Sequence, residues 1–276
     1  MSKILVIGDI MGRPGRQSLA QVLPMWKEEL GWDQKTDVLI GNVENLAHGK
    51  GITPNTIAEM DELGFDAYTS GNHVFDTGAS SQACFDKYDK IIRPYNYTSL
   101  SEDERTVPGQ GYYRFSKNGQ QYLVMNFGGR LFFENQFRGE ISNPFFAFDE
   151  LYGQQAQKDD IIIVDLHAEA TSEKNAFGWH LDGRATLVYG THTHIPTADT
   201  KILPKGTAYQ TDLGFTGAKD SVLGVKIENS LQIFLEKGKF KLEVPESGPA
   251  IVNALLVEIE SGKVIKMERL QKEVVI

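Results

Sequence analysis

The sequence predicts an α/β fold in which two β-sheets face each other as a sandwich and helices flank the outer sides. Short apolar runs alternate with helical segments over the first 90 residues, as expected for a series of β-α-β units. Several of these runs end in polar clusters, as strands of open α/β sheets do where they meet a ligand. The last 30 residues contain two strand-like segments around Ser261-Gly262, which indicates an antiparallel ending.

The first half of the chain alternates strands and helices. Residues 3–8 form a short β-branched run that is typical of a buried parallel strand. Residues 14–30 are expected to be helical because the apolar side chains from Leu19 to Trp26 recur on one face. The other elements expected here are strands at 37–41, 67–70 and 91–93, and helices at 53–63, with Thr53 as N-cap and Pro54 in its first turn, and at 79–88.

The second half begins with a hairpin. Residues 112–115 and 121–126 are strand-like and flank Asn118-Gly119, a dipeptide that favours a tight β-turn. The remaining expected elements are an irregular aromatic loop or lid at 130–144, a helix at 145–158, and strands at 161–165, 185–189, 250–260 and 264–270. We expect one domain over residues 1–276, with a small insertion or lid at about 96–144.

Composition narrows the class of protein. The formal net charge of −9 argues against a broad basic surface for long nucleic acids, although a local basic pocket remains compatible with it. Cys84 is the single cysteine, so neither an internal disulfide nor a cysteine-based zinc site is expected. The apolar run near the N-terminus is too short for a signal sequence, and no stretch is long enough to span a membrane. These features predict a cytoplasmic protein without membrane contact.

Polar residues that suit a metal ion follow five of the predicted strands. They are Asp9, Glu44, Asn45, Asn72, His167, His192 and His194, and His73 lies beside them. Carboxylate, amide oxygen and imidazole together suit Mn²⁺, Fe or Zn²⁺, and a bridging carboxylate lets two ions clamp a phosphate. Four of the six histidines come directly after strand-like runs, which predicts a metal site but leaves the number of ions open.

Each of these residues has a simpler interpretation when it is taken alone. Asp9 could cap the helix that follows it, and Asn72 could be a turn residue. A single histidine is more often a core or surface side chain than a ligand. Lys50 and Arg13 could bind phosphate or could equally be solvated surface charges, whereas His180 is expected to be structural. Asp165 and Glu169 flank His167 and could orient its ring.

Several strings resemble the ordered motifs of the calcineurin-like metallophosphoesterase superfamily. They are Gly8-Asp9, Gly71-Asn72-His73 and Gly190-Thr191-His192-Thr193-His194. The longer strings at 43–51, 167–174 and 202–209 are similar to its bacterial YmdB-like branch, and the match runs from near residue 3 to near residue 270. The sequence departs from the broad superfamily at Met11, where a histidine is usual, and at Glu44, where an aspartate is usual.

The resemblance implies two metal ions, with Fe or Mn favoured over Zn. Asn45 would replace the missing histidine, so one ion would see Asp9, Glu44, Asn45 and His194. The other would see Glu44, Asn72, His167 and His192, with Glu44 as the bridge. His73 would face the substrate and protonate the leaving oxygen, and its alternative role is only to orient Asn72.

The resemblance further implies a phosphodiesterase that attacks its substrate with a metal-activated hydroxide. The best substrate candidates are 2′,3′-cyclic nucleotides such as 2′,3′-cAMP, with a 3′,5′-cyclic nucleotide or a short RNA end as alternatives. His48 and Lys50 lie in loops expected near the site and could contact the substrate. It also makes a homo-oligomer plausible. Two alternatives stay open: a phosphomonoesterase such as a nucleotidase or protein phosphatase, and a metal-dependent regulatory binding protein with little turnover.

Overall fold

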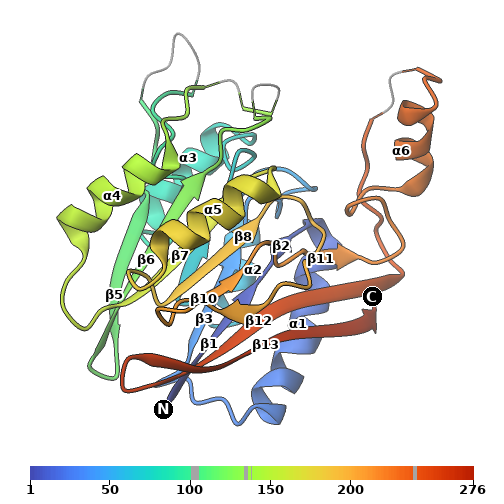
Figure 1. Cartoon of the computed structure of the whole chain (residues 1–276). Helices are drawn as coiled ribbons and strands as arrows, with labels where there is room; N and C mark the ends of the chain where they lie inside the picture. The colour runs from blue at the N-terminus through green and yellow to red at the C-terminus, as the bar shows by residue number, and fades with distance from the viewer. Residues whose placement is uncertain (101–105, 134–135, 138, 239–240) are drawn as a thin grey trace.

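In a computed structural model of the chain, two β-sheets pack face to face and helices cover the outer face of each (Figure 1). The structure describes residues 1–100, 106–133, 136–137, 139–238 and 241–276. The helix–sheet–sheet–helix layering agrees with the fold class that the sequence predicts.

The first sheet is parallel at its centre. β1 (Ser2–Ile7) pairs in parallel with β3 (Val38–Asn42), and β3 pairs in parallel with β4 (Ala67–Thr69). On the other side of β1 lies β12 (Pro249–Glu260), which forms the expected antiparallel hairpin with β13 (Lys263–Val275). The short strands β2 (Asp9–Ile10) and β11 (Phe215–Ala218) complete the sheet.

The second sheet has the strand order β5-β6-β7-β8-β10-β9. Its bounds are β5 Tyr112–Lys117, β6 Gln120–Gly128, β7 Ile161–His167, β8 Leu187–Thr191, β9 Lys201–Ile202 and β10 Ala208–Gln210. Strands β6, β7 and β8 run parallel to one another. Asn118 and Gly119 both have positive φ, at 49° and 78°, so the predicted tight turn between β5 and β6 is confirmed.

The helices form the outer layers. α1 (Gly12–Glu29), α2 (Pro54–Asp61) and α3 (Ala79–Lys87) pack on the first sheet, and α4 (Pro144–Gln155) and α5 (Thr171–Leu181) pack on the second. Thr53 caps α2 in a capping box, as predicted. α6 (Ile227–Phe234) stands apart from both sheets (Figure 1). Among the described residues, no helix is both long and apolar enough to cross a lipid bilayer.

Successive side chains of a strand point to opposite faces of its sheet, so the core is divided into layers. In β1, Ile4 and Val6 point into the space between the sheets, where they join a cluster that includes Ile163 of β7. Leu5 and Ile7 point the other way, into the cluster beneath α1 and α2. Both faces of β1 are therefore buried, which explains why its sequence is continuously apolar.

Two expected segments differ in the structure, and β2, β9, β10, β11 and α6 were not expected. Residues 91–93 make isolated bridges from Ile91 to Tyr68 and from Ile92 to Gln110 rather than a strand. Pro94 follows at once, and because proline has no N–H it cannot extend a ladder. The helix expected at 145–158 ends at Gln155. Of the irregular segment expected at 130–144, residues 134–135 and 138 lie outside the described residues.

Ile163 tests the packing between the sheets. Its side chain is fully buried in the inter-sheet cluster, so Ile163→Ala should lower the free energy of unfolding by about 2–5 kcal/mol. Ile265→Ala on β13, where the side chain is 48% exposed, should change it by less than about 0.5 kcal/mol. Urea denaturation of both variants measures the difference, and equal losses would contradict this account of the core.

Candidate metal centre

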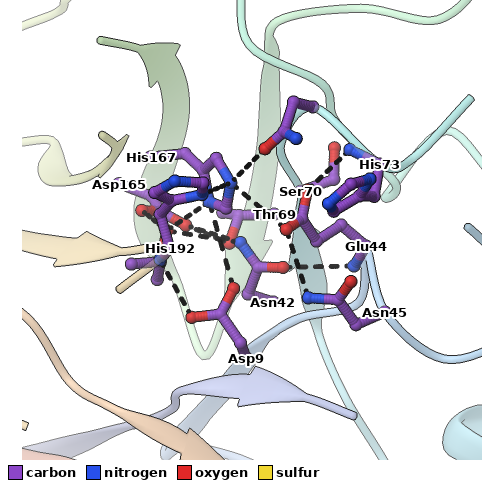
Figure 2. Close-up of polar contacts among 12 residues, drawn as sticks. Asp9, Asn42, Glu44, Asn45, Thr69, Ser70, His73, Asp165, His167 and His192 are labelled. Carbon is purple, nitrogen blue, oxygen red and sulfur yellow. Dashed lines mark hydrogen bonds and ion pairs between the residues drawn. The ribbon is translucent and has the colours of Figure 1, made fainter. Parts of the chain in front are cut away.

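The carboxyl ends of parallel strands in both sheets meet at one edge of the sandwich. Each of these strands ends in, or is followed within a few residues by, one or more of the predicted ligands. The structure brings together Asp9, Glu44, Asn45, Asn72, His167, His192 and His194, all of them buried or nearly so, and Figure 2 shows most of this cluster. Residues up to 185 positions apart in the sequence therefore line one small volume.

A ring of heteroatoms surrounds Nε2 of His167. This nitrogen lies 3.0 Å from Oδ1 of Asn72, 3.2 Å from Oε1 of Glu44 and 3.1 Å from Nδ1 of His192. The ring needs the space that Gly71 leaves, because a Cβ at that position would lie 2.1 Å from Nε2. Glycine in the Gly71-Asn72-His73 string is thus required by the close approach of His167.

The hydrogen bonds around this cluster fix where the protons are. Thr191 donates to Oδ1 of Asp165 at 2.8 Å, so its hydroxyl oxygen accepts from Nδ1 of His167 at 2.9 Å, which leaves Nε2 with a lone pair. Nε2 of His192 faces the Glu169 carboxylate at 3.0 Å, which leaves its Nδ1 unprotonated. Four lone pairs thus converge with no proton between them. A cation placed among these atoms would remove the repulsion between them.

Glu44 lies between two groups of candidate ligands. Its Oε1 is near His167 and also accepts a 3.1 Å hydrogen bond from Nδ2 of Asn45. Its Oε2 accepts from the backbone N–H of His73 at 2.9 Å. Its position is that of a carboxylate that can be shared by two sites.

A second group of donors lies on the other side of Glu44. Nε2 of His194 is 3.4 Å from Nδ2 of Asn45, while its Nδ1 bonds the carbonyl of Leu223 at 2.9 Å. Rotation of the Asn45 amide by 180° would present its oxygen to this site. Oδ1 of Asp9 is fully buried with no hydrogen-bond partner among the described residues. A buried carboxylate oxygen without a partner is costly unless a cation binds it, so this donor set also fits a metal ion.

The ionisable side chains in the cluster shift one another's pKa values. Burial raises the pKa of Asp9, with His194 and His167 opposing it only in part. Burial also acts on Glu44, but His167 and the other imidazoles outweigh it and hold the pKa of Glu44 well below its usual range. Burial lowers the pKa of His192 to about 2, which keeps this imidazole neutral, the form that binds metals.

In the absence of a cation, His167 would serve as the counter-ion of the carboxylates. Burial lowers its pKa, but Glu44 and then Asp9 outweigh burial, so the pKa is raised. A proton on Nε2 can be donated to one neighbouring atom, whereas three heteroatoms surround this nitrogen. We therefore favour a cation over a proton as the group that this geometry accommodates.

The loop that carries His192 and His194 is held in a strained conformation. Both residues follow the end of β8 and have positive φ, at 97° and 63°, which is uncommon outside glycine. Oδ2 of Asp212 accepts from the backbone and hydroxyl of Thr193 between them, at 3.1 and 2.8 Å. The buried ammonium of Lys174 pairs with the same carboxylate at 2.6 Å. This ion pair anchors the loop to α5.

His73 lies at the rim rather than inside the cluster. Its Nδ1 is 2.9 Å from Oδ2 of Asp76, and its side chain is 26% exposed. With Lys50, Asn72 and Gln136 it lines a cavity of about 610 Å³. His73 is therefore placed between the buried donors and a space large enough for a small ligand.

The two predicted substrate contacts lie in different places. Lys50 lines the same cavity as His73, whereas His48 lines a second cavity together with Arg13.

Met11 and His180 are not part of the donor cluster. The side chain of Met11 is buried, and its sulfur packs against Gly224, where a Cβ would lie 2.0 Å from it. His180 bonds Asp149 at 2.9 Å on the outer surface, in agreement with a structural role.

Comparison with known proteins identifies the family. Residues 5–270 match the model of YmdB-like proteins. The chain belongs to the YmdB-like family. A relative from Bacillus subtilis (strain 168), called 2′,3′-cyclic-nucleotide 2′-phosphodiesterase, is 38% identical over 97% of this chain and 96% of its own length.

Solved structures show that this YmdB-like chain shares its fold with a calcineurin-like phosphoesterase. The crystal structure of a protein from Mycoplasma pneumoniae, described as a novel phosphatase, is 33% identical, covers 99% of this chain and 93% of its own, and has a TM-score of 0.87. A calcineurin-like phosphoesterase from Bacillus subtilis has a TM-score of 0.58 at 12% identity, covering 98% of this chain and 90% of its own. At that identity the likeness shows the fold alone, and it agrees with the predicted sandwich.

Several residues that support the cluster were not singled out by sequence reasoning. Asp76, Thr191, Lys174 and Asp212 are the main ones, and Asp165 and Glu169 were expected to orient His167 directly. Instead Asp165 acts through Thr191, and Glu169 bonds His192. Asp212 follows β10, so the rule that found the other clusters, a polar residue after a strand, would also have found it.

Thr191 tests the hydrogen-bonded support of His167. Thr191→Val keeps the shape but removes the hydroxyl that joins Nδ1 of His167 to Asp165. Loss of such a support should weaken Mn²⁺ binding by about 10- to 100-fold, measured by titration calorimetry. Thr186 lies just before β8, outside the cluster, and its hydroxyl accepts from the backbone of Ile162 at 3.2 Å, so Thr186→Val should leave the affinity unchanged. Equal affinities in both variants would contradict the proposed support.

Proposed function

We propose that this chain is a metal-dependent phosphodiesterase that hydrolyses 2′,3′-cyclic nucleotides such as 2′,3′-cAMP with two bound cations. The observation that carries the proposal is the convergence of unprotonated donor atoms around Nε2 of His167, next to a cavity lined by His73. The activity for which the 38% identical relative from Bacillus subtilis is named supports the choice of substrate.

One cation would be held by Asp9, Glu44, Asn45 and His194, and the other by Glu44, Asn72, His167 and His192. Their oxygen and imidazole donors suit Fe or Mn, with Zn as the next choice. When bound, the two ions would polarise the phosphoryl oxygens and supply a nucleophilic hydroxide at neutral pH.

His73 would act on the leaving group. The carboxylate of Asp76 accepts from Nδ1 of His73, which directs the other ring nitrogen away from Asp76. In this arrangement Nε2 can hold a proton and pass it to the departing ribose oxygen. Lys50, in the same cavity, would neutralise charge on a phosphoryl oxygen and hold the ester in place.

The choice of ester class is the first test. Metal-loaded protein should hydrolyse 2′,3′-cAMP, and should act faster on bis-p-nitrophenyl phosphate than on p-nitrophenyl phosphate. Glu44→Gln should abolish turnover and lower the bound metal, because it removes the charge of the shared ligand. Preference for the monoester would instead favour a phosphomonoesterase, in keeping with the word phosphatase used for the Mycoplasma pneumoniae protein. No turnover of any ester would favour the binding protein.

The role of His73 gives a separate prediction. His73→Ala should lower kcat by about 10²- to 10⁴-fold, the usual contribution of a general acid, while the metal content from elemental analysis stays that of the wild type. Asp76→Asn should cause a smaller loss, because the amide oxygen can still accept from Nδ1 and orient the ring, although more weakly than a carboxylate. Loss of metal in His73→Ala would show that the side chain supports the ligands instead.

A further inference from the structure

A second cavity lies beside the one that His73 lines. It has a volume of about 490 Å³ and is bounded by the first turns of α1 and α2, by His48, and by the segment at 241–246. The loop around Gly49 separates the two cavities, with Lys50 on one side and His48 on the other. A Cβ on Gly49 would lie 2.8 Å from Val244, so the 241–246 segment passes close over this loop.

The wall of this cavity continues directly from the metal centre. The backbone N–H of Gly12 donates to the carbonyl of Asn45 at 2.8 Å, which ties the start of α1 to a predicted ligand. Arg13 follows Gly12, and His48 comes three residues after Asn45. The cavity wall is therefore joined to the segment that carries predicted ligands.

Cationic side chains dominate this cavity in a chain whose net charge is −9. Its lining includes the four cations Arg13, Arg16, Lys226 and Lys241 but only the two carboxylates Glu243 and Glu246. Arg16 pairs with Glu59, and Lys226 pairs with Glu243. Among the described residues, Arg13 and Lys241 form no salt bridge and remain available for a ligand.

The sign of the charge at α1 agrees with an anionic ligand. A cation near a helix N-terminus opposes the helix dipole, yet α1 has Arg13 and no acidic residue in its first turn. The first turn of α2, which also faces this cavity, lacks acidic residues as well. His48 adopts a positive φ of 54° at the same rim, a conformation that is uncommon for histidine. A bound anion would offset this accumulation of positive charge.

We propose that this cavity binds a second phosphate group of the substrate, carried on the 5′ oxygen of a 2′,3′-cyclic nucleotide. The proposal rests on the proposed function and deepens it by naming the substrate class. The second phosphate can be a terminal phosphomonoester or the diester that links the last two nucleotides of a short oligonucleotide. Leu242, Val244 and Pro245 give the cavity an apolar side against which a sugar or base can pack.

Three substrates test this proposal on the metal-loaded full chain. They are adenosine 2′,3′-cyclic phosphate, its 5′-phosphorylated form, and the dinucleotide ApA that ends in a 2′,3′-cyclic phosphate. The second phosphate should raise kcat/KM by about tenfold or more, as a charge-assisted hydrogen bond would. A gain with the 5′-phosphorylated form alone identifies a monoester site, and a gain with the dinucleotide identifies an oligonucleotide end. Equal kcat/KM for all three substrates would overturn the proposal.

Variants at exposed positions assign the gain to this cavity. In Arg13→Gln/Lys241→Gln the ratio of kcat/KM between the two-phosphate and one-phosphate substrates should fall to about one. The control Lys237→Gln/Arg269→Gln removes the same charge from exposed positions outside the cavity and should keep the ratio of the wild type. A ratio that falls equally in both double variants would reveal only long-range attraction and would refute a local site.

A binding measurement separates this proposal from the proposed function. By calorimetry, adenosine 3′,5′-bisphosphate should bind about tenfold more tightly than adenosine 3′-monophosphate, and Arg13→Gln/Lys241→Gln should remove the difference. This result needs no turnover, so it would stand even if the chain hydrolysed no ester. Equal affinities for the two nucleotides would reject the second phosphate site whether or not the chain is an enzyme.

Discussion

The meeting of unprotonated donor atoms around Nε2 of His167 is the constraint on which the rest of the site depends. A carboxylate, an amide oxygen and a second imidazole all lie within 3.2 Å of this nitrogen. Without a cation, a proton on His167 could satisfy only one of these contacts, and the others would be repulsive because the hydrogen bonds to Thr191 and Glu169 direct the other ring protons outward. The arrangement of these side chains therefore suits a cation, which would remove the repulsion.

The sandwich makes this convergence possible. Parallel strands in each sheet carry their carboxyl ends to the same edge, and face-to-face packing brings the two edges together. The first sheet contributes Asp9 in β2, and Glu44 and Asn72 in the loops after β3 and β4. The second contributes the histidines. Neither sheet alone supplies both the carboxylates and the imidazoles, so the site exists only where the two layers meet.

A network of buried polar groups outside the donor cluster holds the donor residues in place. Asp165 accepts hydrogen bonds from Thr69 and Thr191, one from each sheet, and burial raises its pKa to about 7. The pair of Lys174 and Asp212 restrains the strained loop between β8 and the following strands. Buried ion pairs are weak contributors to stability but are costly to break, and here the pair fixes a backbone conformation that only the site requires.

Local patterns in the sequence predicted the main strands, the helices that cover them and the polar residues that cluster, because the period of apolar side chains and the polar residues at strand ends are local properties. They did not predict β2, β9, β10, β11 or α6. Runs such as 3–8 and 161–165, each followed by a polar residue, predicted both the layers and the edge where the ligands lie. The hydrogen-bond partners of these residues became clear from the folded structure alone. Glu169 bonds His192 rather than His167, and His48 and Lys50 line separate cavities. These outcomes depend on distances between side chains on elements remote in the chain, which no local pattern encodes.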